Sequence, residues 1–183
     1  MNAAQMLKEA EVLFLLGADE LNMAERTKGF TVYISSLGDV VAHHADVTLT
    51  GATYTDNSGI YVNTLGRVQI GVRAAFAPGE AKEDWAILRA LSDVLDHTLP
   101  FDSLPQLRAA LYEAHPYLGS TDEIVPGEAG DIARAAGLDG TPAGAGFESP
   151  VKDFYLTNPI ARASAVMAEC SQLAKGAGKI AAE

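Results

Sequence analysis

Hydrophobic runs alternate with short polar segments along the first fifty residues, and this pattern predicts a parallel α/β unit. The run Val12–Leu16 is five apolar residues without a polar break, which favours a strand covered on both faces of a parallel sheet. Residues 30–36 and 46–50 predict two further strands, because β-branched residues are frequent in both. Helical segments expected at 20–28 and 40–45 would connect the three strands. Strand, helix, strand, helix, strand is the order of a parallel sheet, and crossovers this short predict a partial sheet.

A β-hairpin is predicted where glycine and polar residues interrupt the pattern. Two short β-like runs, 59–63 and 66–72, are joined by the turn sequence NTLG, in which Gly66 can adopt a positive φ. In one interpretation Asn63 bonds its own turn and Arg67 pairs with a nearby acid, so the hairpin is only structural. In the other, the hairpin tip contacts a cofactor or a partner surface. The residues alone leave both interpretations open.

Two amphipathic helices are predicted in the middle of the chain. The first begins near Glu83, and its apolar residues follow at helical spacing: Trp85, Leu88, Leu91 and Leu95. The second begins near Asp102, with Pro105 in its first turn. It is expected to end before Pro116, since the residue that precedes a proline is disfavoured in helical space.

The C-terminal third combines a loose segment with one further helix. Residues 120–150 are rich in glycine and proline and are expected to be a linker. Asn158 is a natural N-cap and Pro159 a natural first helical residue, and Gly176 is expected to end the helix. An apolar seam runs along that helix at steps of three and four: Ile160, Ala163, Met167, Cys170 and Ala174. The expected domains are an α/β domain at 1–119, the linker at 120–150, a strand-like segment with a C-terminal docking helix at 151–175, and a frayed tail at 176–183.

Composition narrows the possible partners. The 183 residues carry a formal net charge of −11 and no basic stripe, which argues against nucleic acid. No apolar run approaches the ~20 residues of a membrane-spanning helix, so direct membrane insertion is not expected. A single cysteine leaves no internal disulfide and no cysteine-ligated cluster from this chain alone. With no basic and apolar leader at the N-terminus, a reducing compartment is expected.

The residues predict no catalytic, cofactor-binding or metal site. His43 and His44 with Asp46 are the strongest metal candidates, but adjacent helical residues point in different directions, so we expect a structural pair. Cys170 lies on the apolar seam, which favours a small core residue over a reactive thiol. The nucleophile-elbow, P-loop and zinc-protease motifs are all missing from the sequence.

Two separate blocks of the chain resemble one known family. The sequence AHHADVTLTGATYTDNSGIYVNTLGRVQ, followed by PGEAKEDWAILRALSDVL, resembles the molybdopterin oxidoreductase superfamily. Its members carry alanine–aspartate–valine–x–leucine–proline, then an acid, then glycine–threonine–x–x–asparagine–x–glutamate–glycine–arginine–x–glutamine. The ending SPVKDFYLTNPIARASAVMAECS is similar to the C-terminus of the large iron–sulfur subunits of complex I, the respiratory NADH:quinone oxidoreductase. Asn63, Gly66 and Arg67 match the motif, whereas Thr50 replaces its proline, Asp56 stands near its first acid and Leu65 replaces its glutamate.

The resemblance implies an α/β fold: a partial parallel sheet with flanking helices, a β-hairpin insertion and a C-terminal helix. It also implies a non-catalytic scaffold in the peripheral arm of complex I, on the cytoplasmic side of the bacterial inner membrane. The family's iron–sulfur clusters are expected in an N-terminal part that this chain lacks, so no cofactor is expected here. Its partners would be the remainder of its own subunit and neighbouring peripheral-arm subunits. Asn63, Gly66 and Arg67 would then hold the hairpin, and Ile160, Ala163, Met167 and Cys170 would dock the last helix.

A second hypothesis belongs to a different class of protein. The chain could be a pterin-cofactor-binding fragment of a molybdopterin oxidoreductase, or a stand-alone small-molecule-binding module. This hypothesis predicts a tightly bound pterin or metal in the purified chain. The loss of a carboxylate at Leu65 argues against it, because that change removes an acceptor at the hairpin tip.

Overall fold

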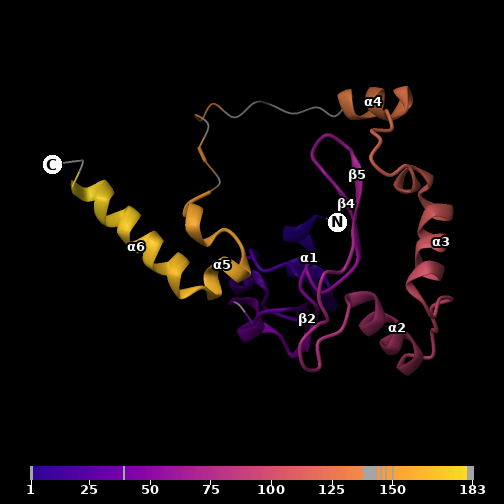
Figure 1. The fold of residues 1–183 in the computed structure, drawn as a ribbon, viewed down its shortest axis with the longest axis horizontal. Coiled ribbons are helices and arrows are strands. Elements are labelled where there is room, and N and C mark those ends of the chain that lie inside the picture. Colours follow the sequence, from indigo (N-terminus) through magenta and orange to yellow (C-terminus); the bar gives the residue numbers. More distant parts are fainter. Residues whose placement is uncertain are drawn as a thin grey trace. The chain divides into compact units, whose positions relative to one another are not determined.

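The chain forms two compact units, Met1–Gly51 with Gly146–Glu183, and Ala52–Ala145 (Figure 1). The computed structural model describes residues 2–38, 40–137 and 151–180, together with residues 144, 146, 148 and 149. Helices and strands are mixed in it, with a parallel sheet and a separate antiparallel pair. The predicted α/β class is therefore confirmed.

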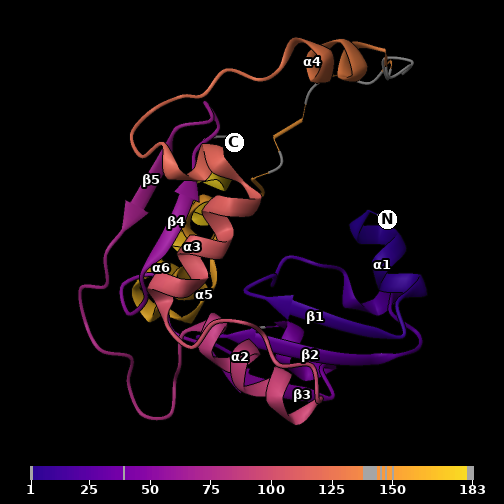
Figure 2. The ribbon, with the colours of Figure 1, turned by 90° about the vertical axis from the view of Figure 1, so that its right-hand side faces the viewer.

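The first unit is built on a three-stranded parallel sheet in the order β1–β2–β3 (Figure 2). Its elements follow in sequence as α1 (Ala3–Glu9), β1 (Val12–Leu16), the 3₁₀ turn η1 (Met23–Glu25), β2 (Phe30–Ser35), η2 (Val40–His44) and β3 (Val47–Thr50). Three parallel strands joined by short crossovers form the partial sheet that the sequence predicts.

The main hydrophobic cluster of this unit lies on one face of the sheet, although Val32 and Ile34 of β2 are also buried on the other. Leu13 and Leu15 of β1 are buried there, as is Tyr33, which pairs in register with Leu15. Three further side chains complete the same cluster: Leu7, Met23 and Val41. The alternate residues of β1 are exposed, with 54% of Val12, 39% of Phe14 and 43% of Leu16 accessible. The expectation that Val12–Leu16 is covered on both faces is therefore wrong for this chain by itself.

The helix expected at 20–28 is a single 3₁₀ turn, and Arg26 explains why. Its backbone leaves helical space at φ −88° and ψ 101°, which directs the guanidinium back toward the sheet. It donates to the carbonyls of Ala10 (3.2 Å) and Phe30 (2.9 Å) and to Thr31 Oγ1 (2.5 Å). A continuing helix would carry Arg26 away from these acceptors.

The second unit contains the hairpin and the middle helices. Strand β4 (Gly59–Val62) pairs antiparallel with β5 (Val68–Gly71), and the helices are α2 (Asp84–Val94) and α3 (Leu104–Ala114), followed by the turn η3 (Pro116–Gly119). Helix α4 (Ala129–Ala136) lies inside the segment expected to be a linker, where an Arg134–Asp131 ion pair spans one helical turn. Residues 138–143, 145, 147 and 150 of that expected linker lie outside the described residues.

The C-terminal segment differs from the single helix expected there. The strand-like stretch is a 3₁₀ turn, η4 (Phe154–Leu156), and the helix is two helices, α5 (Pro159–Ala163) and α6 (Ala165–Ile180). Ser164 causes the break, because its extended backbone ends α5 while its hydroxyl accepts from the Met167 N–H at 3.3 Å and caps α6. Helix α6 continues past Gly176, which was the expected end, and residues 181–183 lie outside the described part.

Candidate functional site

Asn63 organises the hairpin tip. Its side-chain oxygen accepts from the backbone N–H groups of Leu65 and Arg67, each at 3.0 Å. Its carbonyl accepts from Gly66, which has a φ of +84°. An asparagine side chain that bonds its own turn is a common way to close a loop. Leu65, at the position of the motif's glutamate, is 72% exposed and offers the tip no hydrogen-bonding side chain.

Arg67 connects the hairpin to the segment that follows η3. Its guanidinium donates to the carbonyl of Asp122, and the Asp122 N–H donates to the carbonyl of Val68 at 2.7 Å. Asp122 itself has a φ of +63°, and isolated bridges pair Arg67 with Ile124 and Val68 with Thr121. A short piece of chain is thereby added to the outer edge of β5, and Val68 is fully buried.

Tyr61 packs on the glycines of the two hairpin strands. A Cβ at Gly59 would lie 3.0 Å from its ring, and one at Gly71 would lie 2.9 Å from it. Gly59 and Gly71 are paired across the hairpin, so the ring covers a backbone surface that any larger residue would block. The close packing of Tyr61 therefore explains why glycine stands at both positions.

A cavity of about 290 Å³ lies within the second unit beside β4. Its lining includes three charged side chains: Glu83 and Asp84 at the start of α2, and Arg108 on α3. Burial raises the pKa of the Asp84 carboxyl above its usual value. Arg108 Nη2 is buried without a hydrogen-bond partner among the described residues. The cavity thus combines apolar side chains with one basic and two acidic ones.

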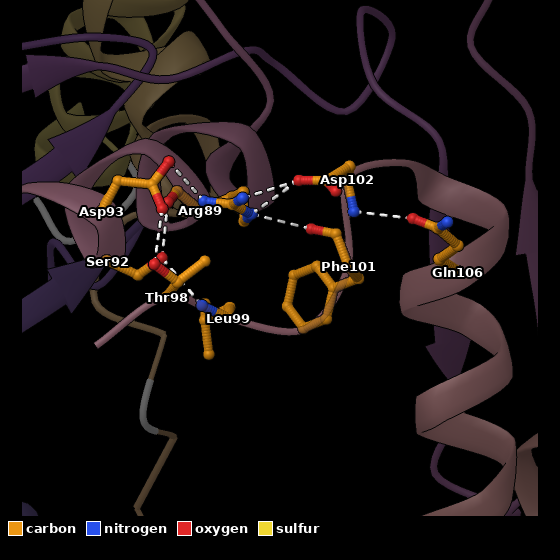
Figure 3. Close-up of polar contacts among 8 residues, drawn as sticks. All are labelled: Arg89, Ser92, Asp93, Thr98, Leu99, Phe101, Asp102 and Gln106. Atoms are coloured by element: carbon orange, nitrogen blue, oxygen red, sulfur yellow. Dashed lines mark hydrogen bonds and ion pairs between the residues drawn. The ribbon is translucent and has the colours of Figure 1, made fainter. Parts of the chain in front are cut away.

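Arg89 of α2 holds the connection between α2 and α3 (Figure 3). It pairs with Asp93 and Asp102, each at 2.6 Å, and donates to the carbonyl of Phe101 at 3.0 Å. Its hydrogen bond to Asp93, supported by one from Thr98, lowers the pKa of the Asp93 carboxyl. The same two carboxylates raise the pKa of Arg89 itself. This network closes the loop and holds no free acid or base.

Asp153 fastens the turn η4 to α6. Its carboxylate accepts from Lys175 at 2.9 Å, from the Ser171 hydroxyl at 2.5 Å and from the Tyr155 N–H at 3.1 Å. The Lys175 contact is the largest cause of the lowered pKa of Asp153, and the Ser171 hydrogen bond is the next. On α6 itself, Met167 and Cys170 of the predicted seam are partly buried.

Arg162 of α5 lies at the carboxyl end of β1. It forms an ion pair with Asp19, whose side chain is only 9% exposed, and reaches Glu20 at 4.0 Å. In open α/β sheets, ligands bind outside the carboxyl ends of the strands. Here that position beside β1 is acidic and is already taken by an arginine from the C-terminal segment.

Asp46, which stands beside the two adjacent histidines in the sequence, makes structural contacts. Asp46 accepts from the Thr31 N–H at 2.7 Å and donates its own N–H to the Thr31 carbonyl. Within the described part of the chain, no cluster of three or more histidine, cysteine or acidic side chains could hold a metal ion. The same residues include no helix long and apolar enough to cross a bilayer.

Sequence reasoning missed the three side chains that make the long connections, Arg89, Asp153 and Arg162. Arg162 and Asp19 are 143 positions apart. Nothing local distinguishes such a residue from an ordinary solvent-exposed charge. Only Arg89 had a signal in the sequence: it lies four residues before Asp93 on a predicted helix, a spacing that favours an ion pair.

Comparison with known proteins places the chain in a family. Residues 1–94 match the model of the molybdopterin oxidoreductase family, and residues 120–170 match that of the C-terminal region of the NADH-ubiquinone oxidoreductase G subunit. The NADH-ubiquinone oxidoreductase 75 kDa subunit of Reclinomonas americana is 40% identical over 91% of this chain and 24% of its own length. The 78 kDa mitochondrial subunit of Neurospora crassa is 41% identical over 89% of this chain and 23% of its own length.

A plant relative agrees with these two. The mitochondrial NADH dehydrogenase [ubiquinone] iron-sulfur protein 1 of Solanum tuberosum is 36% identical over 92% of this chain and 23% of its own length. The chain therefore spans about a quarter of the length of the curated relatives it matches. Since the family model covers the first 94 of the 183 residues, the chain belongs to the molybdopterin oxidoreductase family, and its relatives there are the large subunits of NADH-ubiquinone oxidoreductase.

Proposed function

We propose that this chain is a non-catalytic scaffold part of the large subunit of NADH:quinone oxidoreductase, the complex that carries electrons from NADH to quinone. The observation that supports this most is the likeness to the large subunits at 36–42% identity over about nine-tenths of the chain. A second support is the match of residues 120–170 to the C-terminal region of the NADH-ubiquinone oxidoreductase G subunit, next to the molybdopterin oxidoreductase match at residues 1–94.

The family name raises the question of whether this chain binds a molybdopterin cofactor. Such a cofactor is a large anion, which calls for basic side chains and free backbone N–H groups. At the carboxyl end of β1 the structure has Asp19 and Glu20 instead, and Arg162 is already paired with them. The cavity beside β4 is lined by two acids, Glu83 and Asp84, against one arginine, Arg108. These residues do not fit the cofactor, which supports the scaffold proposal.

The proposal extends to partners and location. The partners are the remainder of the same subunit and neighbouring subunits of the peripheral arm, on the cytoplasmic side of the bacterial inner membrane. Several large apolar side chains are exposed on the first unit, including Phe14 and Leu16 of β1 and Leu173 of α6. Apolar surface of this extent is typical of a part that is covered in a larger assembly.

Two measurements test this function. A native-gel blot of membranes, with an antibody against VKDFYLTNPIARAS, is expected to detect a large band that oxidises NADH. Signal only from a small, free polypeptide would contradict the proposal. The purified chain is also expected to contain no molybdenum by mass spectrometry and no fluorescent pterin after oxidative release. A stoichiometric pterin would favour the cofactor-binding alternative instead.

A further inference from the structure

The cavity beside β4 runs along the edge of that strand. Five consecutive residues, 57–61, line it. Three of them, Gly59, Ile60 and Tyr61, belong to β4, where successive residues face opposite sides of the sheet, so a cavity that touches all three follows the strand edge. The other edge of β4 pairs with β5 from Gly59 to Val62, and the part of the chain that the structure describes supplies β4 with no second strand. The edge beside the cavity therefore lacks a β-sheet partner.

The opposite wall of the cavity is apolar. Helix α3 contributes Leu104, Leu107 and Leu111, and α2 contributes Trp85. None of the residues of α3 is buried, although these leucines lie on one side of the helix at spacings of three and four. The helix thus presents an apolar stripe to a space that the described residues do not fill.

Two charged groups of the cavity lining have no partner among the described residues. Arg108 Nη2 is buried without a partner, and the half-buried carboxylate of Asp84 forms no ion pair or hydrogen bond with the described residues. The neighbouring Glu83 is already engaged, because it accepts from Trp85 Nε1 at 2.7 Å and pairs with Arg73 at 3.6 Å. A ligand that fits must accept a hydrogen bond from Arg108 and can donate one to Asp84.

We propose that this cavity is a strand-addition site, in which an extended segment of a partner polypeptide lies between β4 and α3. A peptide backbone carries both a carbonyl and an N–H at every residue, so it complements Arg108, Asp84 and the strand edge together. Alternate side chains of the segment would lie against the three leucines. The volume of about 290 Å³ has room for only a few residues of an extended segment, so the rest of the segment would run along the strand edge outside the cavity. This inference is separate from the scaffold proposal and does not depend on it.

Trp85 provides the readout, because it is the only tryptophan of the chain and lines the cavity. The probe is an acetylated heptapeptide amide of alternating threonine and valine with a central leucine. We expect its titration to shift the tryptophan emission with a dissociation constant of about 0.1–1 mM, since a short peptide loses its own conformational entropy on binding. The matched control is the same peptide methylated at every backbone nitrogen, which keeps the side chains but removes the donors. It is expected to bind at least about tenfold more weakly.

Two protein variants test whether Arg108 contacts the peptide. Arg108→Met is expected to weaken binding of the heptapeptide about tenfold. Glu113→Met, at an exposed position of the same helix, should leave the binding affinity unchanged. Circular dichroism checks that both variants keep the helical content of the parent. Equal binding of the two peptides, or of the parent and Arg108→Met, would overturn the proposal, as would no emission change up to about 5 mM peptide.

Two further outcomes would identify a different occupant and also overturn the proposal. If N-acetyl-leucinamide binds as tightly as the heptapeptide, the cavity takes a small apolar molecule. If the chain forms a dimer by light scattering, and the heptapeptide dissociates it, the strand edge is covered by a second copy.

Discussion

At the residue scale, the first unit depends on a tight junction around Gly29. This glycine has a φ of +88°, and a Cβ there would lie 2.6 Å from the carbonyl oxygen of Ala10 and 2.7 Å from that of Glu11. The same carbonyl of Ala10 accepts from Arg26. Gly29 is thus required both by its backbone conformation and by the close approach of the chain that joins α1 to β1.

We predict that Gly29→Ala lowers the free energy of unfolding by about 3 kcal/mol, because a left-handed conformation and a backbone clash are combined. Gly17→Ala is the matched control. Gly17 also has a positive φ, +62°, but nothing lies within 4 Å of a Cβ at that position. Gly17→Ala should therefore lower the free energy of unfolding by only about 1 kcal/mol. Urea unfolding followed by circular dichroism measures both variants, and equal losses would show that the clash with the carbonyls is relieved.

Asp153 leads to a pH prediction at the same scale. Its folded pKa lies below the ordinary value of 3.8, so it contributes stability above that pH. This contribution is lost as the pH falls through the lowered folded pKa. We expect amide exchange at Tyr155, whose N–H bonds to Asp153, to become faster below about pH 4 than intrinsic rates explain. In Asp153→Asn this step should vanish. If the substituted chain keeps the same step, another group is responsible.

At the element scale, the starts of α1 and α5 follow local capping, but the connections between helices follow side chains that lie far apart. Asn158 accepts from the Ala161 N–H at 2.9 Å and begins α5, as the sequence predicts. The length of α5 depends on the competing cap at Ser164. The loop from α2 to α3 is closed by Arg89, whose side chain is only 17% exposed and contacts residues on both sides of the loop.

Arg89 provides the element-scale prediction. We expect Arg89→Met to increase amide exchange at Leu99 and Asp102 about tenfold, because the loop loses both ion pairs and the bond to the Phe101 carbonyl. Arg89→Lys keeps the charge but cannot bridge two carboxylates with a planar fork, so an intermediate increase is expected. Exchange measured by mass spectrometry resolves the loop from the helices. If the lysine variant matches the parent, charge alone holds the loop.

At the scale of the whole molecule, the exposed apolar residues fit a chain that is part of a larger assembly. The face of β1 opposite the core carries three large apolar side chains, whereas parallel sheets in complete domains are covered on both faces. On α6, Val166 and Leu173 are each 66% exposed. These two residues, seven positions apart, lie on the same side of the helix. Both residues lie beside the predicted apolar seam of this helix and widen it on the exposed side.

A pair of neighbouring substitutions tests whether α6 docks. In the full subunit, Leu173→Asp is expected to reduce the assembled complex on a native gel several-fold, because a buried, unpaired carboxylate opposes association. Gln172→Asp adds the same charge one residue away, at an exposed polar position, and should leave assembly unchanged. Equal amounts of complex from both variants would show that this face of α6 stays in solvent. Met167→Asp is less informative, since Met167 is partly buried within the chain.

The sequence by itself determined the elements whose signals are local. Strand Val12–Leu16, the hairpin with its Asn63 turn, the start of α2 and the cap of α5 all follow from short-range sterics, hydrogen bonding and hydrophobic pattern. Family membership was also visible, because the motif residues lie within two continuous blocks.

Only the tertiary structure decided the remainder. The shortening of the segment at 20–28 depends on carbonyls that Arg26 reaches across the fold. The pairing of Arg162 with Asp19 joins residues 143 positions apart. The cavity beside β4 exists because β4 and α3 approach each other without filling the space between them. Contacts of this kind have no local signature, since the free energy that selects them comes from packing between distant segments and is not encoded in any short window of residues.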